Sequence, residues 1–97
     1  MATYITLIRY TEQGIQKMKE SPARLDKARK AIKAAGAELK AFYLTMGQYD
    51  AVAISEGPGD EVYMTTMLTI SSAGAIRTET LRAFTEDEYR KIVSAMP

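Results

Sequence analysis

Cysteine and histidine are both absent from the 97-residue sequence. Without cysteine the chain can form no disulfide, and it cannot hold zinc or an iron–sulfur cluster through thiolates. Without histidine it lacks the commonest general base and the commonest ligand of transition metals and haem. No segment concentrates the acidic side chains that a calcium or magnesium site needs. We therefore expect a protein that works without a metal ion or any other cofactor.

Long apolar runs are also missing, although 46% of the residues are hydrophobic. No segment approaches the ~20 apolar residues that a membrane-spanning helix needs. The first residues, Met-Ala-Thr-Tyr, lack the charged and apolar regions of a signal peptide. This length and composition predict one domain over residues 1–97, located in the cytoplasm, with no membrane partner.

A strong charge of one sign is missing as well, because the net charge is only +1. The charges are nevertheless uneven: residues 1–49 hold nine basic and four acidic side chains, and residues 50–97 hold four and eight. The basic excess lies mainly between Lys17 and Lys40, and no aromatic side chains interleave with it as in a surface that stacks on bases. We interpret it as a solvated helix surface and expect no nucleic-acid partner.

Segments rich in β-branched and aromatic residues predict four strands, over residues 3–9, 38–45, 51–56 and 75–84. The five residues between the second and third strands are few enough for a β-hairpin. Ser21 and Pro22 are typical of a helix start, and Gly36 of a helix end. A second helix is predicted over 61–72 with Asp60 as its cap. Shorter helical segments are expected over 11–19 and, after a capping box at Thr85, as far as Ala95.

The predicted order of elements is β-α-β-β-α-β with an added C-terminal helix. Short connections and right-handed crossovers turn this order into an α+β, ferredoxin-like βαββαβ sandwich. We expect an antiparallel sheet in which the fourth strand lies beside the first, followed by the third and the second. Both main helices then cover one face of the sheet and leave the other face open.

The strands carry apolar residues on both faces, which is unusual for a sheet with one face open to water. By strict alternation we assign Tyr4, Ile8, Leu39 and Tyr43 to the open face. Such a face needs a cover, and a second copy of the chain is the simplest one. The sequence therefore predicts a homodimer or a higher homo-oligomer. The alternative is an ordinary half-polar face with a few exposed tyrosines.

Two segments resemble the GYD-domain family: residues 46–54, Met-Gly-Gln-Tyr-Asp-Ala-Val-Ala-Ile, and residues 76–84, Ile-Arg-Thr-Glu-Thr-Leu-Arg-Ala-Phe. Residues 21–24 fit the same family's helix start, although Gln48 interrupts the literal Gly-Tyr-Asp string. The resemblance implies a dimeric α/β barrel, in which two ferredoxin-like sheets face each other. It implies no particular activity, because the wider barrel group includes small monooxygenases, haem-degrading enzymes and ligand-sensing modules.

Five side chains are candidates for binding a small-molecule ligand, namely Tyr4, Tyr43, Tyr49, Asp50 and Arg82. Tyr49 and Asp50 offer a phenol and a carboxylate at the mouth of a barrel, and Arg82 can hold an acidic ligand. Asp50 can equally have a structural role, with its carboxylate accepting backbone N–H groups in the hairpin.

Two hypotheses for the function remain open on the sequence alone. The first is a non-catalytic ligand-binding or assembly module, and the absence of histidine and cysteine favours it. The second is a cofactor-independent, small monooxygenase-like enzyme that acts on a phenolic or acidic molecule in the barrel pocket. A closed pocket would favour the enzyme, and a barrel filled by its own side chains would favour the module.

Overall fold

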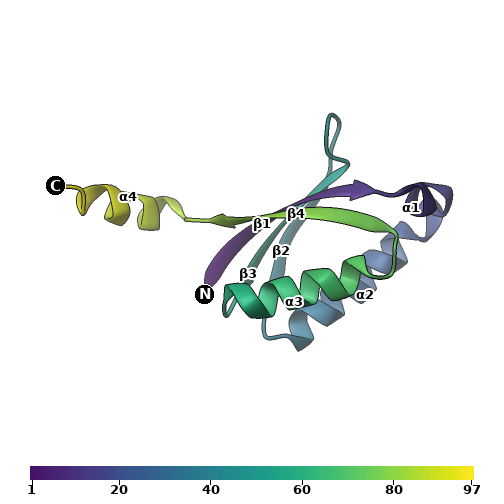
Figure 1. Cartoon of the computed structure of the whole chain (residues 1–97), viewed down its shortest axis with the longest axis horizontal. Coiled ribbons are helices and arrows are strands. Elements are labelled where there is room, and N and C mark those ends of the chain that lie inside the picture. The colour runs from purple at the N-terminus through teal and green to yellow at the C-terminus, as the bar shows by residue number, and fades with distance from the viewer.

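The computed structural model describes residues 1–97 as a four-stranded antiparallel sheet with helices packed on one face (Figure 1). The strands are β1 (Ala2–Tyr10), β2 (Glu38–Leu44), β3 (Ala51–Gly57) and β4 (Ile76–Ala83). Their order across the sheet is β2-β3-β1-β4, which confirms the predicted topology. The fold is α+β and ferredoxin-like, because each half supplies a strand, a helix and a further strand.

Two main helices cover one face of the sheet, and a third extends away from it. The covering helices are α2 (Ser21–Ala34) and α3 (Asp60–Ser71), and the projecting helix is α4 (Glu86–Ser94) (Figure 1). The chain passes from β1 into α2 through α1 (Glu12–Gln16) and the 3-10 helix η1 (Met18–Glu20). No helix combines the length and the apolar composition needed to cross a bilayer.

The helix starts differ from the predicted caps. Ser21 is the first residue of α2 rather than its cap, because η1 runs directly into this helix. Gly59 precedes α3, and Asp60 is the first helical residue, with its carboxylate engaged outside the helix. The capping box at Thr85 is confirmed, since its hydroxyl accepts the N–H of Glu88 and the Glu88 carboxylate accepts the N–H of Thr85.

The assignment of Tyr4, Ile8 and Leu39 to the open face is wrong. All three side chains face α2 and α3 and are at most 8% exposed, whereas Tyr43 does lie on the open face and is 58% exposed. A bulge at Lys40 explains why Leu39 faces the helices, because the extra residue in β2 breaks the alternation between Leu39 and Tyr43. Strand β1 does alternate as predicted, but alternation alone does not say which of its two faces meets the helices.

Small residues on β3 decide which face meets the helices. Ala51, Ala53, Ser55 and Gly57 all point toward the helices and are buried. A methyl group added at Gly57 would touch the rings of two tyrosines, Tyr4 and Tyr63, at 3.4 and 3.5 Å. The helices can approach this face because it carries little volume, and the larger residues of β3 are left on the other face.

The opposite, open face of the sheet has an apolar centre. The register places one set of partly exposed side chains on that face: Ile5, Leu7, Val52, Ile54 and Leu81. No helix of the chain covers them (Figure 1). The predicted apolar open face therefore exists, with different residues from those first assigned.

Helix α1 is fastened to the turn that precedes β4. The N–H of Thr11 donates to the carbonyl of Ala75 at 3.0 Å, and the Thr11 hydroxyl donates to the carbonyl of Gly74. Gly14 is buried in this contact, and a Cβ atom at this position would lie 2.1 Å from the Ala75 oxygen. Only a residue without a side chain allows the two backbones to come this close.

Candidate functional site

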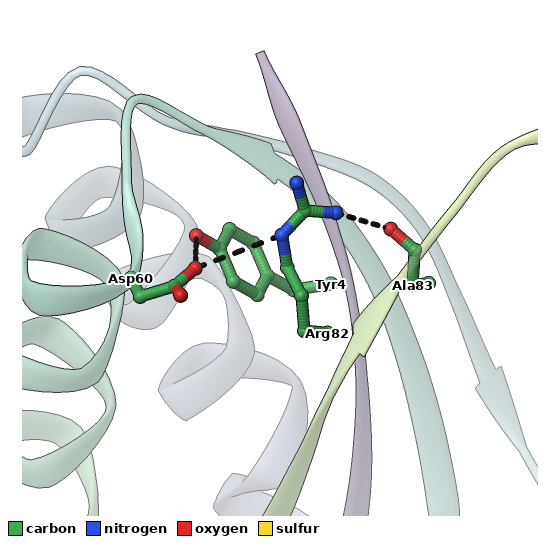
Figure 2. Close-up of polar contacts among 4 residues, drawn as sticks. All are labelled: Tyr4, Asp60, Arg82 and Ala83. Carbon is green, nitrogen blue, oxygen red and sulfur yellow. Dashed lines mark hydrogen bonds and ion pairs between the residues drawn. The ribbon is translucent and has the colours of Figure 1, made fainter. Parts of the chain in front are cut away.

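Two of the five candidate residues, Tyr4 and Arg82, meet at one end of the helix-covered face (Figure 2). The Tyr4 hydroxyl donates to Asp60 Oδ1 at 2.6 Å, and Arg82 Nε lies 3.7 Å from the same oxygen. Register brings Tyr4 and Arg82 together, because they are paired residues on β1 and β4. Asp60 comes from the first turn of α3 and was absent from the candidates. Its 56-residue separation from Tyr4 left no local signal for this contact.

The Tyr4 ring is stacked face to face on Tyr63, with ring centroids 4.1 Å apart and planes 5° from parallel. Tyr63 is itself buried, and its hydroxyl lies 3.1 Å from that of Thr6. Burial, followed by the hydrogen bond to Asp60, raises the pKa of Tyr4 to about 12. Tyr4 is therefore a protonated donor at neutral pH and is unsuited to act as a base.

The remaining polar atoms of this cluster are also engaged within the chain. The Arg82 guanidinium donates to the carbonyl of Ala83 and lies 4.7 Å from the centre of the Phe84 ring. Asp60 is 71% exposed but has both Tyr4 and Arg82 as partners. The arrangement fastens the start of α3 to the sheet, and it leaves the Asp60 carboxylate as its only widely exposed polar group.

Asp50 and Tyr49 lie at the hairpin between β2 and β3, away from this cluster. Asp50 Oδ2 accepts the N–H of Tyr10 at 2.9 Å, so the carboxylate joins the hairpin to the end of β1. The structural interpretation predicted a backbone N–H donor, and one is present, but it comes from the neighbouring strand rather than from the turn. The Tyr49 hydroxyl donates to Glu79 Oε1 at 3.3 Å, and the Arg9 guanidinium lies 4.8 Å from the centre of its ring.

The five sequence-predicted candidates thus occupy three places within one chain. Tyr4 and Arg82 lie at one end of the helix-covered face, Tyr43 lies on the open face, and Tyr49 and Asp50 lie at the hairpin. No group of three or more acidic side chains lies close enough together to hold a metal ion. The structure does not bring the candidates into a single pocket of the monomer.

A cavity of about 440 Å³ lies between the sheet and the two covering helices. Its walls are mainly apolar and run from buried Ile32 to the exposed side chains of Lys27 and Thr69, so the cavity reaches the surface. If it were wholly enclosed and empty, a void of 440 Å³ would cost about 10 kcal/mol, which is as much as the whole stability of a small domain. The space must therefore be open to water or filled.

The sequence carries one signal for this cavity, although an apolar stripe on a helix normally indicates ordinary core. Ala28 and Ala31 lie on the inner side of α2 and line the cavity together with Ala53 of β3. Alanines placed opposite each other leave space that leucines would fill. A stripe of alanines on the core side of an amphipathic helix was therefore the available clue.

Helix α4 has no neighbour in the chain on its apolar side. Its apolar side chains gather on one stripe and are all at least 45% exposed: Tyr89, Ile92, Val93 and, just beyond the helix, Met96. The helix contributes no buried residue. An isolated helix of nine residues is only marginally stable in water, and here the capping box at its start is the main contact that stabilises it.

The fold and these surfaces define a small α+β protein of the ferredoxin-like class, with an open sheet and a projecting helix. A family model described as GYD domain matches residues 4–93. The chain belongs to this GYD domain family, as the two sequence segments indicated.

One similar protein is named "Glutamine synthetase and cystathionine beta-lyase binding protein" and comes from Thermus thermophilus. It is 29% identical over 84 residues, which cover 86% of this chain and 88% of that protein. A crystal structure of a Thermus thermophilus protein is 28% identical, with a TM-score of 0.50 over 88% of this chain and 95% of that chain.

Two solved structures from Mycobacterium tuberculosis share the fold. The feast or famine regulatory protein, complexed with L-methionine, has a TM-score of 0.63 at 16% identity, and the leucine response regulatory protein has 0.62 at 18% identity. The matches cover 90% and 89% of this chain but only 54% of each mycobacterial chain. This chain thus spans about half the length of those proteins, and at such identity the likeness concerns the fold alone.

Proposed function

We propose that this protein is a homodimeric, non-catalytic binding module that attaches to metabolic enzymes in the cytoplasm. The observation that carries the proposal is the apolar open face of the sheet, whose centre no element of the chain covers. A second copy is the simplest cover, because two identical sheets can pack face to face about a two-fold axis.

The rim of the open face supports the same arrangement. Arg9 and Arg77 lie at one end of the apolar centre, and Glu79 lies beside Leu7 on the edge strand β4. An apolar centre surrounded by charged groups is the usual anatomy of a stable interface. Two sheets in this arrangement form the dimeric α/β barrel that the sequence resemblance implied.

A matched pair of leucine variants tests the dimer. Leu81 lies on the open face and is 44% exposed, while Leu68 lies on the outer side of α3 and is 66% exposed. We expect Leu81→Asp to sediment as a monomer at micromolar concentration, because it would bury a charge in the apolar part of the interface, next to Ile5. Leu68→Asp should sediment like the unmodified dimer. A dimeric Leu81→Asp protein would contradict the proposal.

Attachment to enzymes rests on the relative's name and on helix α4. The relative from Thermus thermophilus is named for binding glutamine synthetase and cystathionine beta-lyase. In the present chain α4 carries an uncovered apolar stripe beyond the end of the sheet, where a large partner can reach it (Figure 1). An amphipathic helix that lays its apolar side in a groove is a common mode of protein recognition.

Purified glutamine synthetase and cystathionine beta-lyase from the source organism serve as the test partners. We expect co-sedimentation of one of them with the unmodified protein. Ile92→Asp should abolish the complex and leave the dimer intact, whereas Ser94→Asp adds the same charge off the apolar stripe and should retain the complex. Dissociation of the dimer by Ile92→Asp would show that α4 belongs to the dimer interface instead.

The enzyme hypothesis draws no separate support from the geometry. It needs Tyr4, Tyr43, Tyr49 and Arg82 around one ligand, and these side chains lie in three places of the chain. Tyr4 also keeps its proton to a pH near its pKa of about 12. The Asp50 variants described in the Discussion decide whether the hairpin residues Tyr49 and Asp50 also bind a ligand or, as we expect for Asp50, have a structural role.

A further inference from the structure

We propose that the cavity between the sheet and helices α2 and α3 binds an apolar molecule that carries a single carboxylate. The site is separate from the space that two facing sheets would enclose, because it lies on the other face of the sheet. The inference therefore stands whether or not the protein dimerises or attaches to an enzyme.

The size and walls of the cavity fit a small-molecule site. Its volume of about 440 Å³ lies within the range of typical ligand pockets, and 15 of its 21 lining residues are hydrophobic. The alanines of α2, Ala28 and Ala31, face Ala53 and Phe42 across the space. A core that folded for stability alone would fill this volume with larger side chains, so the missing volume indicates an occupant from outside the chain.

The charged side chains around the cavity indicate that the ligand carries a negative charge at one end. The lining contains two cationic side chains, Arg24 and Lys27, and no carboxylate. The Arg24 guanidinium donates to the carbonyls of Lys17 and Gly14 at 3.0 and 3.3 Å, which fixes it beside the cavity and leaves further N–H groups available. Lys27 forms no ion pair within the chain. Two cations without a counter-charge favour an anionic group at this position.

Hydroxyl groups give the cavity a limited number of neutral polar contacts. Ser21 and Tyr10 lie 3.4 Å apart near Arg24, at the start of α2. Thr6 and Tyr63 pair with each other on the sheet side. An apolar body with one charged end matches this distribution, whereas a sugar or a nucleotide would leave many of its polar groups without partners.

The test titrates the purified protein with dodecanoate, with naphthoate and with the uncharged dodecanol, and measures heat of binding and melting temperature. We expect saturable binding of at least one of the two carboxylates, with a rise in melting temperature that grows with ligand concentration. Dodecanol should bind more weakly than dodecanoate, because it lacks the charge that the two cations recognise.

Two matched pairs of variants locate the bound molecule. Ala31→Leu fills the cavity and should weaken carboxylate binding about tenfold or more while raising the melting temperature of the free protein. Ala34→Leu, on the exposed side of the same helix, should change neither. Lys27→Glu should weaken dodecanoate about fivefold and leave dodecanol unaffected, whereas Lys30→Glu, which lies outside the cavity, should leave both unaffected.

Three results would overturn this inference. The first is the absence of saturable binding by both carboxylates. The second is equal binding by the Ala31→Leu and Ala34→Leu proteins, which would place the ligand elsewhere. The third is loss of binding in the Leu81→Asp protein with full binding by Ala31→Leu, which would place the ligand between the two sheets. Failure to dimerise without loss of binding would affect the proposed function only.

Discussion

The carboxylate of Asp50 offers the sharpest test of a structural role against a binding role. Its Oδ2 atom accepts the N–H of Tyr10 at 2.9 Å, in a partly buried contact. The Asp50 backbone makes two further bonds, from its N–H to the carbonyl of Ile8 and from its carbonyl to the N–H of Thr45, both at 2.8 Å. Replacement by alanine keeps these two backbone bonds and removes only the acceptor for Tyr10.

The loss of stability expected for Asp50→Ala follows from the N–H of Tyr10, which is left without its acceptor. Hydrogen bonds to charged groups contribute about 1.5–3 kcal/mol, and partial exposure of this contact favours the lower end, so we expect Asp50→Ala to lose about 1.5 kcal/mol. In a domain of this size each kcal/mol shifts the melting temperature by about 4–8 °C. Asp50→Asn keeps an oxygen acceptor in place and should lose less than about 1 kcal/mol.

Thermal and urea melts of both variants provide the measurement, with Asp26→Ala as the control. Asp26 is exposed on α2 and makes no side-chain hydrogen bond or ion pair, so its removal should leave stability unchanged. Equal losses for Asn and Ala would refute the hydrogen-bond argument, because only the charge would then matter. An Asn variant that melts normally but loses a ligand retained by the unmodified protein in native mass spectrometry would refute the structural role.

Three further predictions concern other contacts. The free energy of unfolding should fall between pH 10 and 12, because the pKa of Tyr4 is 10.0 in the unfolded chain and about 12 in the folded one. Denaturant melts across this pH range should show that Tyr4→Phe removes this part of the loss. Gly14→Ala should lower the free energy of unfolding by about 1–3 kcal/mol, because its Cβ atom would clash with the Ala75 carbonyl. Gly59→Ala is the control: its Cβ atom would meet nothing within 4 Å, so the loss should be less than half as large, and equal losses would contradict the clash. Thr85→Ala removes a helix cap worth about 1 kcal/mol, so it should reduce the helical circular dichroism signal of α4. It should leave the melting temperature of the sheet unchanged, and a lower melting temperature would instead show that α4 packs on the sheet.

Several parts of the candidate site could be predicted from local pattern. The hairpin between β2 and β3 placed Asp50 where its carboxylate could accept a backbone N–H, and it accepts one, although the donor is Tyr10 of β1 rather than a residue of the turn. Alternation along the fourth strand likewise places Arg77 and Glu79 on one face with Leu81, and the register puts that face on the open side of the sheet. Each of these inferences uses only the position of the hairpin or the two-residue period of a strand that has no bulge.

Other parts of the site depend on contacts between distant segments. Asp60 was expected to cap α3, but its carboxylate instead accepts the hydroxyl of Tyr4 from the first strand. The cavity likewise depends on how far α2 and α3 stand from the sheet, which a stripe of alanines permits without requiring. No local propensity encodes a distance between layers or a partner 56 residues away.

By itself the sequence determined the elements, their order and therefore the ferredoxin-like topology, because strand and helix periods and short connections leave few alternatives. It also determined that both faces of the sheet would carry apolar residues. Only the tertiary structure decided that the face of Tyr4 and Ile8 is the buried one, since the small residues of β3 let the helices approach there. The bulge at Lys40 then moved Leu39 to the same face, because one extra residue inverts a two-residue period.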